Sequence, residues 1–245
     1  MRVAIDGLTK RYGAYRALQN VSMTIESGQI VAVLGANGAG KTTLLRCLAT
    51  IAAPNAGSIH LDGEPLSRGR LDLRQRLFFL PDSPFLFAWP TPVQHIGMVL
   101  RLYGKERAGT ADRVFGLMEA LDLLGCGRAP IAALSRGQSY KTALAALLAV
   151  EPELVLLDEP FASGMDPQGT LVLREWARRA AGNGTTLLYT TQILEVAEAF
   201  SDKVAILHRG GLHAFDSVAA LREQTGAAEG SVLAGVMAPL RETGR

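Results

Sequence analysis

The stretch from Gly35 to Thr43 carries residue types that bind phosphate. It fits the pattern Gly-x-x-x-x-Gly-Lys-Ser/Thr at every fixed position, between an apolar run at 30–34 and a helix-like run at 44–48. Glycines let the backbone approach phosphate oxygens closely, and the helix that follows directs its N–H groups at the anion. A glycine-rich turn without a ligand is the alternative, but it does not explain why every position of the pattern is filled.

Within this stretch we predict that Lys41 reaches the β- and γ-phosphates of a nucleotide and that the Thr42 hydroxyl binds Mg²⁺. The dipole of the next helix would add positive potential at the phosphates. The residues expected to bind nucleotide here are Gly35, Ala36, Asn37, Gly38, Ala39, Gly40, Lys41, Thr42 and Thr43.

Two adjacent carboxylates, Asp158 and Glu159, follow the apolar run at 154–157, which is typical of a strand buried on both faces. At the end of such a strand Asp158 could hold Mg²⁺, and Glu159 could polarise a water for in-line attack on the γ-phosphate. Acidic pairs are also common where a strand meets solvent. The catalytic interpretation therefore depends on the phosphate loop found earlier in the chain.

The pentapeptide Leu-Ser-Arg-Gly-Gln at Leu134 to Gln138 precedes a helical stretch. A serine followed by glycine at a helix start can cap the helix and can also bind an anion. With this third motif the sequence resembles the nucleotide-binding subunit of ABC transporters, whose signature is close to Leu-Ser-Gly-Gly-Gln within a helical subdomain. The resemblance extends from Val3 to about Thr225 and rests on several separately spaced motifs.

The resemblance implies that two copies close head-to-tail on two ATP molecules. Ser135, Gly137 and Gln138 of one copy would then contact the nucleotide held by the phosphate loop of the other. Tyr12 matches the aromatic residue that stacks on adenine, although it could also be a simple strand-end residue, and nearby Tyr15 is the less favoured candidate.

Asp82 and Gln192 depart from the pattern of the family. The family usually has Gln at the first position, where its carbonyl binds Mg²⁺, and a switch histidine at the second. Asp82 could ligate a hard cation more strongly than an amide, with a shorter reach. Gln192 can donate a hydrogen bond to a γ-phosphate oxygen but bears no charge. Exporter-type members often carry an acidic residue at the first position and daunorubicin-type exporters carry Gln at the second, so the resemblance favours export.

Two further departures are Arg136, which replaces the first signature glycine, and Ala146, which stands where many members have Arg. Since the phosphate loop and the acidic pair are intact, we expect hydrolysis of ATP with Mg²⁺ as cofactor. The expected catalytic residues are Lys41, Glu159 and Gln192, and the expected metal ligands are Thr42, Asp82 and Asp158.

The apolar patterns and the resemblance together predict an α/β fold, a P-loop NTPase of the ABC-ATPase type. It should have a mostly parallel core sheet flanked by helices, an N-terminal antiparallel β part and an inserted helical subdomain. Strands are expected at 3–8, 21–26, 30–34, 58–62, 77–80, 154–157, 185–190, 204–207 and 212–215. Helices are expected from the phosphate loop to about 51 and at 92–103, 111–124, 136–150, 167–181 and 193–200.

We expect one ATPase domain over 1–225, with the helical insert at about 85–150. Residues 226–245 are rich in Gly and Ala, have little periodicity and predict a short mobile C-terminal tail. The stretch from Ala143 to Val150 is the longest candidate for a membrane span, but it is far shorter than the ~20 residues required and predicts a buried helix. No secretory signal or common lipid anchor is visible, so membrane association is expected through another chain.

Composition narrows the function classes. The chain has 245 residues, 48% of them hydrophobic, and a formal net charge of +2, which is too small to argue for nucleic acid as a partner. Cys47 and Cys126 have no metal or redox spacing and are expected to be reduced thiols in a cytosolic protein.

Aromatic residues concentrate between two prolines at 84 and 90. Phe85, Phe87 and Trp89 are expected to form a docking cleft for a membrane (permease) subunit, whereas Phe78 and Phe79 are expected to pack in the core. The resemblance implies that this stretch receives a short helix of the membrane subunit.

The leading hypothesis is an ATP-binding and hydrolysing subunit of an ABC transporter at the cytoplasmic face of the cell membrane. It would drive export through a separate membrane subunit and pair with a second copy of itself or a related ATPase. One alternative is a soluble ABC ATPase acting on nucleic acid or ribosomes. Another is a small-molecule phosphoryl-transfer enzyme, which gives no reason for the Leu134 to Gln138 motif.

Overall fold

The computed structural model describes residues 1–162, 164–225, 233 and 235. At its centre is a six-stranded sheet with the order β10-β9-β3-β8-β7-β6. All neighbouring strands run parallel except β10, which is antiparallel to β9. The strands are β3 (Ile30–Leu34), β6 (Leu77–Leu80), β7 (Leu154–Leu157), β8 (Thr186–Thr191), β9 (Lys203–His208) and β10 (Gly211–Asp216). The mostly parallel core sheet is as predicted.

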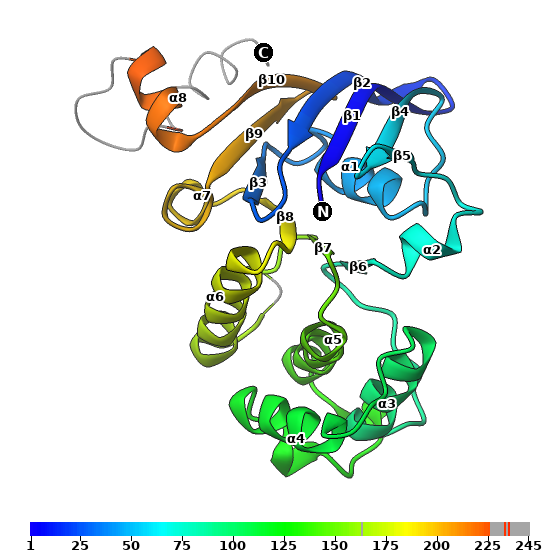
Figure 1. Cartoon of the computed structure of the whole chain (residues 1–245). Coiled ribbons are helices and arrows are strands. Elements are labelled where there is room, and N and C mark those ends of the chain that lie inside the picture. Colours follow the sequence, from blue (N-terminus) through cyan, green and yellow to red (C-terminus); the bar gives the residue numbers. More distant parts are fainter. Residues whose placement is uncertain (163, 226–232, 234, 236–245) are drawn as a thin grey trace.

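A second, four-stranded sheet has the order β2-β1-β4-β5 and lies beside the first (Figure 1). Its strands are β1 (Val3–Tyr12), β2 (Tyr15–Ile25), β4 (Ala56–Leu61) and β5 (Glu64–Pro65), and every pair is antiparallel. The predicted antiparallel β part is confirmed, but β2 begins six residues earlier than residue 21. Gly13, with φ +59°, turns the chain back at once, so that Tyr12 pairs directly with Tyr15.

The helices cover both faces of the core sheet, and α3, α4 and α5 pack together in the lower part of Figure 1. They are α1 (Lys41–Leu48), α2 (Leu71–Arg74), α3 (Pro92–Leu102), α4 (Thr110–Ala120), α5 (Arg136–Val150), α6 (Pro167–Gly182), α7 (Leu194–Phe200) and α8 (Val218–Thr225). Sequence patterns missed α2 and α8. They also placed the end of α4 too late, since Asp122 adopts φ +53° and the helix stops before it.

Alternate residues of each core strand face two different hydrophobic clusters. Ile30, Ala32 and Leu34 of β3 belong to the larger cluster, which includes α5 and α6. Val31 and Val33 belong to the other cluster, with α1 and the antiparallel sheet. Burial on both faces explains why these strands are continuously apolar in the sequence.

The carboxyl ends of β3, β8, β7 and β6 meet at one edge of the core sheet. Register pairs Leu34 with Thr191, Tyr189 with Leu157, and Leu157 with Leu80. Segments that follow these four strands are therefore neighbours, although they are far apart in the sequence. Ligand sites of parallel α/β sheets are found at this kind of edge.

The helix α5 is buried along nearly its whole length, from Tyr140 to Val150. Within the described residues no helix has the length and apolar character needed to cross a membrane. The apolar stretch from Ala143 to Val150 is thus core, as predicted.

The predicted tail at 226–245 lies outside the described residues except at 233 and 235. Leu233 is buried in the larger core cluster, and its backbone N–H donates to Oε1 of Glu198 on α7 over 2.9 Å. This residue therefore packs against the body of the protein.

Candidate nucleotide-binding and hydrolysis site

The phosphate loop joins β3 to α1 and needs its glycines for steric reasons. Gly38 and Gly40 have φ of +79° and +106°. A Cβ on Gly40 would lie 2.4 Å from the carbonyl oxygen of Ala17, and one on Gly35 would lie 2.5 Å from that of Leu207. Gly40 precedes α1 without any side-chain cap, so the first N–H groups of this helix can face an anion.

Lys41, the first residue of α1, is buried with a relative exposure of 6%. Its Nζ donates to the carbonyl oxygens of Gly35 and Ala36 over 2.8 and 3.3 Å, and it lies 3.3 Å from Oε1 of Glu159. A triphosphate in the loop would compete for this ammonium group with far more negative charge than these partners offer.

Asp158 and Thr42 form the pair of oxygen donors expected for a metal. The Thr42 hydroxyl donates to Oδ1 of Asp158 over 3.1 Å, and Asp158 is buried with 5% exposure. The described residues contain no cluster of three His, Cys, Asp or Glu side chains that could hold a metal alone. One carboxylate and one hydroxyl beside a phosphate site fit Mg²⁺, which usually takes its remaining ligands from phosphates and water.

Thr190 at the end of β8 was not identified from the sequence. Its hydroxyl donates to Oδ1 of Asp158 over 2.7 Å and accepts a hydrogen bond from the N–H of Glu159 over 2.8 Å. One buried side chain thus fixes both acidic residues. The only sequence signal is a threonine at the end of a predicted neighbouring strand, which is too common to single it out.

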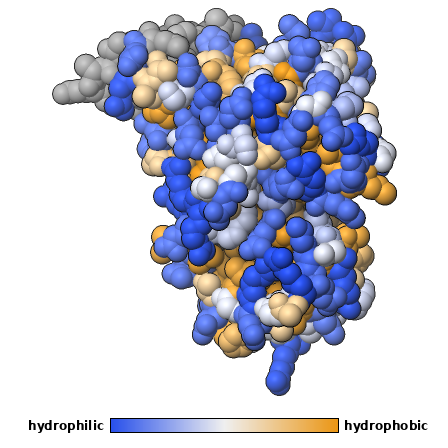
Figure 2. All heavy atoms as spheres, viewed as in Figure 1, coloured by the Kyte–Doolittle hydropathy of each residue, from blue (hydrophilic) through white to orange (hydrophobic). Residues whose placement is uncertain are grey.

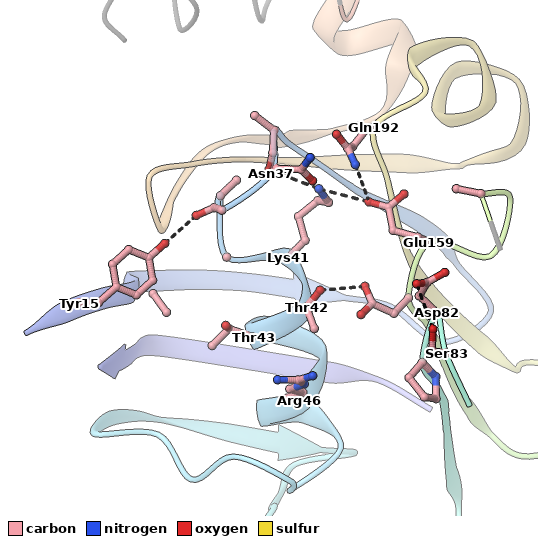
Figure 3. Close-up of a pocket in the computed structure, with 18 of the residues that line it drawn as sticks. Tyr15, Asn37, Lys41, Thr42, Thr43, Arg46, Asp82, Ser83, Glu159 and Gln192 are labelled. Carbon is pink, nitrogen blue, oxygen red and sulfur yellow. Dashed lines mark hydrogen bonds and ion pairs between the residues drawn. The ribbon is translucent and has the colours of Figure 1, made fainter. Parts of the chain in front are cut away.

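The three predicted catalytic residues converge on one atom. Oε1 of Glu159 lies 3.3 Å from Nζ of Lys41 and accepts from Nε2 of Gln192 over 3.5 Å (Figure 3). Glu159 has φ +48°, a left-handed backbone that is costly for a non-glycine residue. Such strain is typical of functional positions.

These groups line a cavity of about 670 Å³, a size suited to a nucleotide. Figure 3 shows Tyr15 at one side of it and Asp82 at the other, with Lys41 and Thr42 between them. The residues predicted from the sequence that line it are Ala36, Asn37, Gly38, Ala39, Gly40, Lys41, Thr42, Thr43, Asp82, Asp158, Glu159 and Gln192. Gly35, the first residue of the loop, directly follows β3 and is not among the described residues that line the cavity.

The two tyrosines lie differently with respect to the cavity, and the stacking of Tyr12 on adenine stays a prediction. Tyr15 lines the cavity, and its hydroxyl donates to the carbonyl oxygen of Gly38 over 2.9 Å. Tyr12 is not among the described residues that line it, and Nζ of Lys10 lies 5.0 Å from the centre of its ring. The two residues pair across the hairpin of β1 and β2, and the hydroxyl of Tyr15 is the one that reaches the loop.

The signature motif caps α5. The Ser135 hydroxyl accepts from the N–H of Gln138 over 3.1 Å, and the Gln138 side chain accepts from the N–H of Ser135 over 3.0 Å. This capping box confirms the predicted helix start. Ser135, Gly137 and Gln138 do not line the cavity in the described part of this chain, and Ser135 is exposed.

The loop before α6 is tied to the signature helix. Lys141 of α5, almost fully buried, donates to Oδ2 of Asp166 over 2.8 Å, while Oδ1 of Asp166 accepts from the N–H of Gly169 over 2.7 Å. The ammonium group of Lys141, and then the Gly169 N–H, lower the pKa of Asp166. Asp166 thus caps α6, and its contact with Lys141 joins two segments that are distant in the sequence.

The predicted docking aromatics are exposed. Phe85, Phe87 and Trp89 have relative exposures of 97%, 55% and 69%. Phe78 and Phe79 are partly buried and pack against the two core clusters, as predicted. On the face seen in Figure 2, hydrophobic residues also show between hydrophilic ones over the lower, helical part.

A phosphate loop, a pair of oxygen donors for a metal, and a carboxylate able to polarise a water, all at the carboxyl edge of a parallel sheet, are the parts of a P-loop ATPase. A family model described as "ABC transporter" matches residues 18–162. The chain belongs to the ABC transporter family as an ATP-binding subunit, and it is an ATPase.

Relatives with different transport roles are similar to this chain. The daunorubicin resistance ATP-binding protein DrrA3 of Streptomyces coeruleorubidus is 35% identical over 91% of this chain and 71% of its own length. The ABC-type transporter ATP-binding protein EcsA of Bacillus subtilis is 32% identical over 91% and 90%. The sulfate/thiosulfate import ATP-binding protein CysA of Gloeobacter violaceus is 36% identical over 86%, and the chain spans only 61% of that longer protein.

A solved structure described as an ATP-binding subunit of an ABC transporter has the same fold. It superimposes with a TM-score of 0.91 at 28% identity, covering 98% of this chain and all of the other. A dimeric ATP-binding cassette bound to ADP and phosphate, 23% identical with a TM-score of 0.77, shares the fold as well.

Proposed function

We propose that this chain, as one ATPase domain over 1–225, powers export through a separate membrane subunit at the cytoplasmic face of the cell membrane. The observation that carries the ATPase part is the convergence of Lys41 and Gln192 on Oε1 of Glu159, beside the Thr42–Asp158 pair. Export is supported by Asp82 and Gln192 at the two departing positions. The similarity to a daunorubicin resistance protein agrees with export, while the sulfate importers are the competing precedent.

The side chains have separate roles in hydrolysis. Phosphates entering the loop draw Lys41 away from Glu159, which leaves that carboxylate free to accept a proton from the attacking water. Gln192 donates its amide to a γ-phosphate oxygen in place of Glu159. Thr42 and Asp158 would hold Mg²⁺, whose charge stabilises the phosphates in the transition state.

A second copy completes the site. The exposed start of α5 presents Ser135 and Gly137, with N–H groups and a hydroxyl whose proton can still be donated. The backbone N–H groups at the start of α1 would receive phosphate within one chain. We propose that the start of α5 covers the γ-phosphate bound by a second copy or by a related subunit.

At the base end of the nucleotide we propose that Tyr12 stacks on adenine. Its ring is 46% exposed, and Lys10 covers it on one side. The hydroxyl of Tyr15 instead holds the phosphate loop through Gly38.

The membrane subunit is proposed to dock on Phe85, Phe87 and Trp89. Three exposed aromatic side chains in a short stretch are costly in water and typical of interface centres. They lie in the segment that joins β6 to α3, a few residues after Asp82, so a force applied there acts on Asp82 and on the helical insert together.

Inside-out membrane vesicles test this function. ATP added outside should drive accumulation of the transported compound if the direction is export, and should drive its release if the direction is import. Phe87→Ala and Trp89→Ala should abolish transport and co-purification of the membrane subunit while leaving ATP affinity intact. Phe115→Ala, which removes an exposed aromatic on α4, is the matched control. Loss of ATP binding in the Phe87 or Trp89 variants would assign them to the fold instead.

A further inference from the structure

Asp82 and Arg136 form an ion pair. Both stand at positions where this chain departs from the usual pattern of the family. Nη2 of Arg136 lies 3.1 and 3.3 Å from Oδ1 and Oδ2 of Asp82. Asp82 follows β6 at the carboxyl edge of the sheet, and Arg136 is the first residue of α5. Both side chains line the cavity that holds the phosphate loop.

The pair changes what Asp82 can do. A carboxylate that shares both oxygens with a guanidinium is a weaker metal ligand, because its charge is already neutralised. Thr42 and Asp158, by contrast, already stand together as oxygen donors beside the loop. The Mg²⁺ role predicted for Asp82 would require the pair to break first.

Arg136 stands at the terminal-phosphate end of the cavity. Tyr15 lies at the opposite side from Asp82, the partner of Arg136, with Lys41 between them (Figure 3). A triphosphate held by Lys41, with its base toward the tyrosines, extends its last phosphate toward Asp82. The guanidinium has a fork of donors that matches phosphate oxygens, which a lysine or an amide does not offer.

Little free energy is lost when the guanidinium of Arg136 exchanges the Asp82 carboxylate for a phosphate. The side chains of Arg136 and Asp82 are 65% and 42% exposed, and ion pairs this open to water contribute little to stability. A terminal phosphate carries more negative charge than a carboxylate and can compete for the same donors.

We propose that Arg136 binds the γ-phosphate of ATP in the cavity of its own chain and that Asp82 positions its guanidinium rather than ligating Mg²⁺. This inference rests on the proposed nucleotide site. Arg136 would add a positively charged side chain to this site, at a position where the family signature has a glycine.

Equilibrium binding of ATP and ADP to the purified full chain tests the proposal. Arg136→Ala should weaken ATP binding about tenfold, the value of one charge-assisted hydrogen bond, and leave ADP binding unchanged. Arg136→Lys should recover part of the loss. Since Arg136 acts within its own chain, the loss should be the same at low and high protein concentration. Arg128→Ala, an exposed arginine on the same helical insert, should change neither affinity.

The role of Asp82 is tested by titrating Mg²⁺ at fixed ATP. Asp82→Asn should leave the Mg²⁺ concentration for half-maximal ATP binding within about twofold, because the pair is exposed and weak. A much larger Mg²⁺ requirement in this variant would make Asp82 a metal ligand and overturn the proposal. So would unchanged ATP affinity in Arg136→Ala, an equal loss for ATP and ADP, or a loss seen only at concentrations where dimers form.

Lys41→Ala separates this inference from the proposed nucleotide site. It should weaken the binding of both nucleotides, because its ammonium group serves the whole phosphate chain. If the unmodified chain bound neither nucleotide, the nucleotide site itself would fail. If it binds both and Arg136→Ala binds equally well, only the present inference fails.

Discussion

We propose that the starts of α1 and α5 both receive phosphate, but their surroundings are opposite. At α1 the key side chains are buried: Lys41, Asp158 and Thr190 have exposures of 6%, 5% and 0%. No side chain caps this helix, so its N–H groups face the cavity. At α5 the start is exposed, and Ser135 and Gln138 cap it from within the chain.

This contrast indicates that one end binds the nucleotide and the other end completes the nucleotide site of a second chain. The enclosed end has its donors fixed by the sheet and can hold a nucleotide by itself. At the exposed end the capping box satisfies the N–H groups of Ser135 and Gln138. Ser135 and Gly137, which are not among the described residues that line the cavity of their own chain, can offer a hydroxyl and a backbone N–H to a second copy. The simplest structure that uses both ends is a pair of chains, each supplying the open end to the other's enclosed end.

The largest expected effect lies at the enclosed end. Glu159→Gln keeps the shape but removes the proton acceptor, so kcat should fall about 10²- to 10⁴-fold with ATP affinity retained. ATP-dependent dimers should accumulate, which size-exclusion chromatography measures. Glu119→Gln, exposed on α4, should hydrolyse ATP normally. Near-normal turnover in Glu159→Gln would show that this residue is not the general base and would contradict the proposed difference between the two ends.

A change at the exposed end should reduce turnover without reducing binding. Ser135→Ala removes a helix cap and the proposed γ-phosphate donor, and we expect about tenfold slower hydrolysis from the lost hydrogen bond. Thr91→Ala is a close control, because Thr91 and Gln94 form the same capping box at α3. Both variants should lose about 1 kcal/mol of stability. Equal turnover in the two variants would show that Ser135 acts only as a helix cap.

A smaller effect should distinguish two threonines at opposite ends of β8. Thr190→Val leaves Asp158 and the Glu159 N–H without their shared partner and should cost about 1–3 kcal/mol of unfolding free energy. It should also raise the Mg²⁺ requirement. Thr186→Val removes the hydroxyl that donates to the Met1 carbonyl oxygen and should cost stability alone. Matching Mg²⁺ curves for both variants would show that Thr190 does not organise the metal site.

The smallest effect concerns pH. Because Gln192 occupies the switch position and bears no titratable group, the rate of hydrolysis should lack an inflection near ~6.5, the ordinary histidine pKa. Desolvation lowers the pKa of the buried His95 of α3, which moves its titration below the ordinary histidine range. A clear inflection that disappears in Gln192→Ala would contradict the proposed role.

Local patterns predicted the enclosed end well. The phosphate loop is one continuous segment after β3, and Asp158 follows an apolar strand, so spacing alone indicated both. The sequence also predicted the start of α5, since a capping box is local. The ends of helices were predicted less accurately, because a single residue with left-handed backbone, such as Asp122, stops a helix without changing its apolar pattern.

Contacts between distant segments were not predictable in this way. Thr190 meets Asp158 only because β8 lies beside β7, and the sequence does not state strand order. Arg136 and Asp82 were each noticed as departures, but nothing in one sequence says that they touch. Side-chain direction at the hairpin likewise decided which tyrosine reaches the loop, since both stand at the same turn.

Thiol cross-linking tests most directly whether two chains share one nucleotide site. Asn37→Cys in the loop and Ser135→Cys at α5 would be made in separate chains, both carrying Cys126→Ser and Glu159→Gln. Burial raises the pKa of the remaining Cys47 thiol to about 11, so it should not react. A short bifunctional thiol reagent should give a covalent dimer only when both chains and ATP are present. A mixture that yields no more dimer than either chain alone would contradict it.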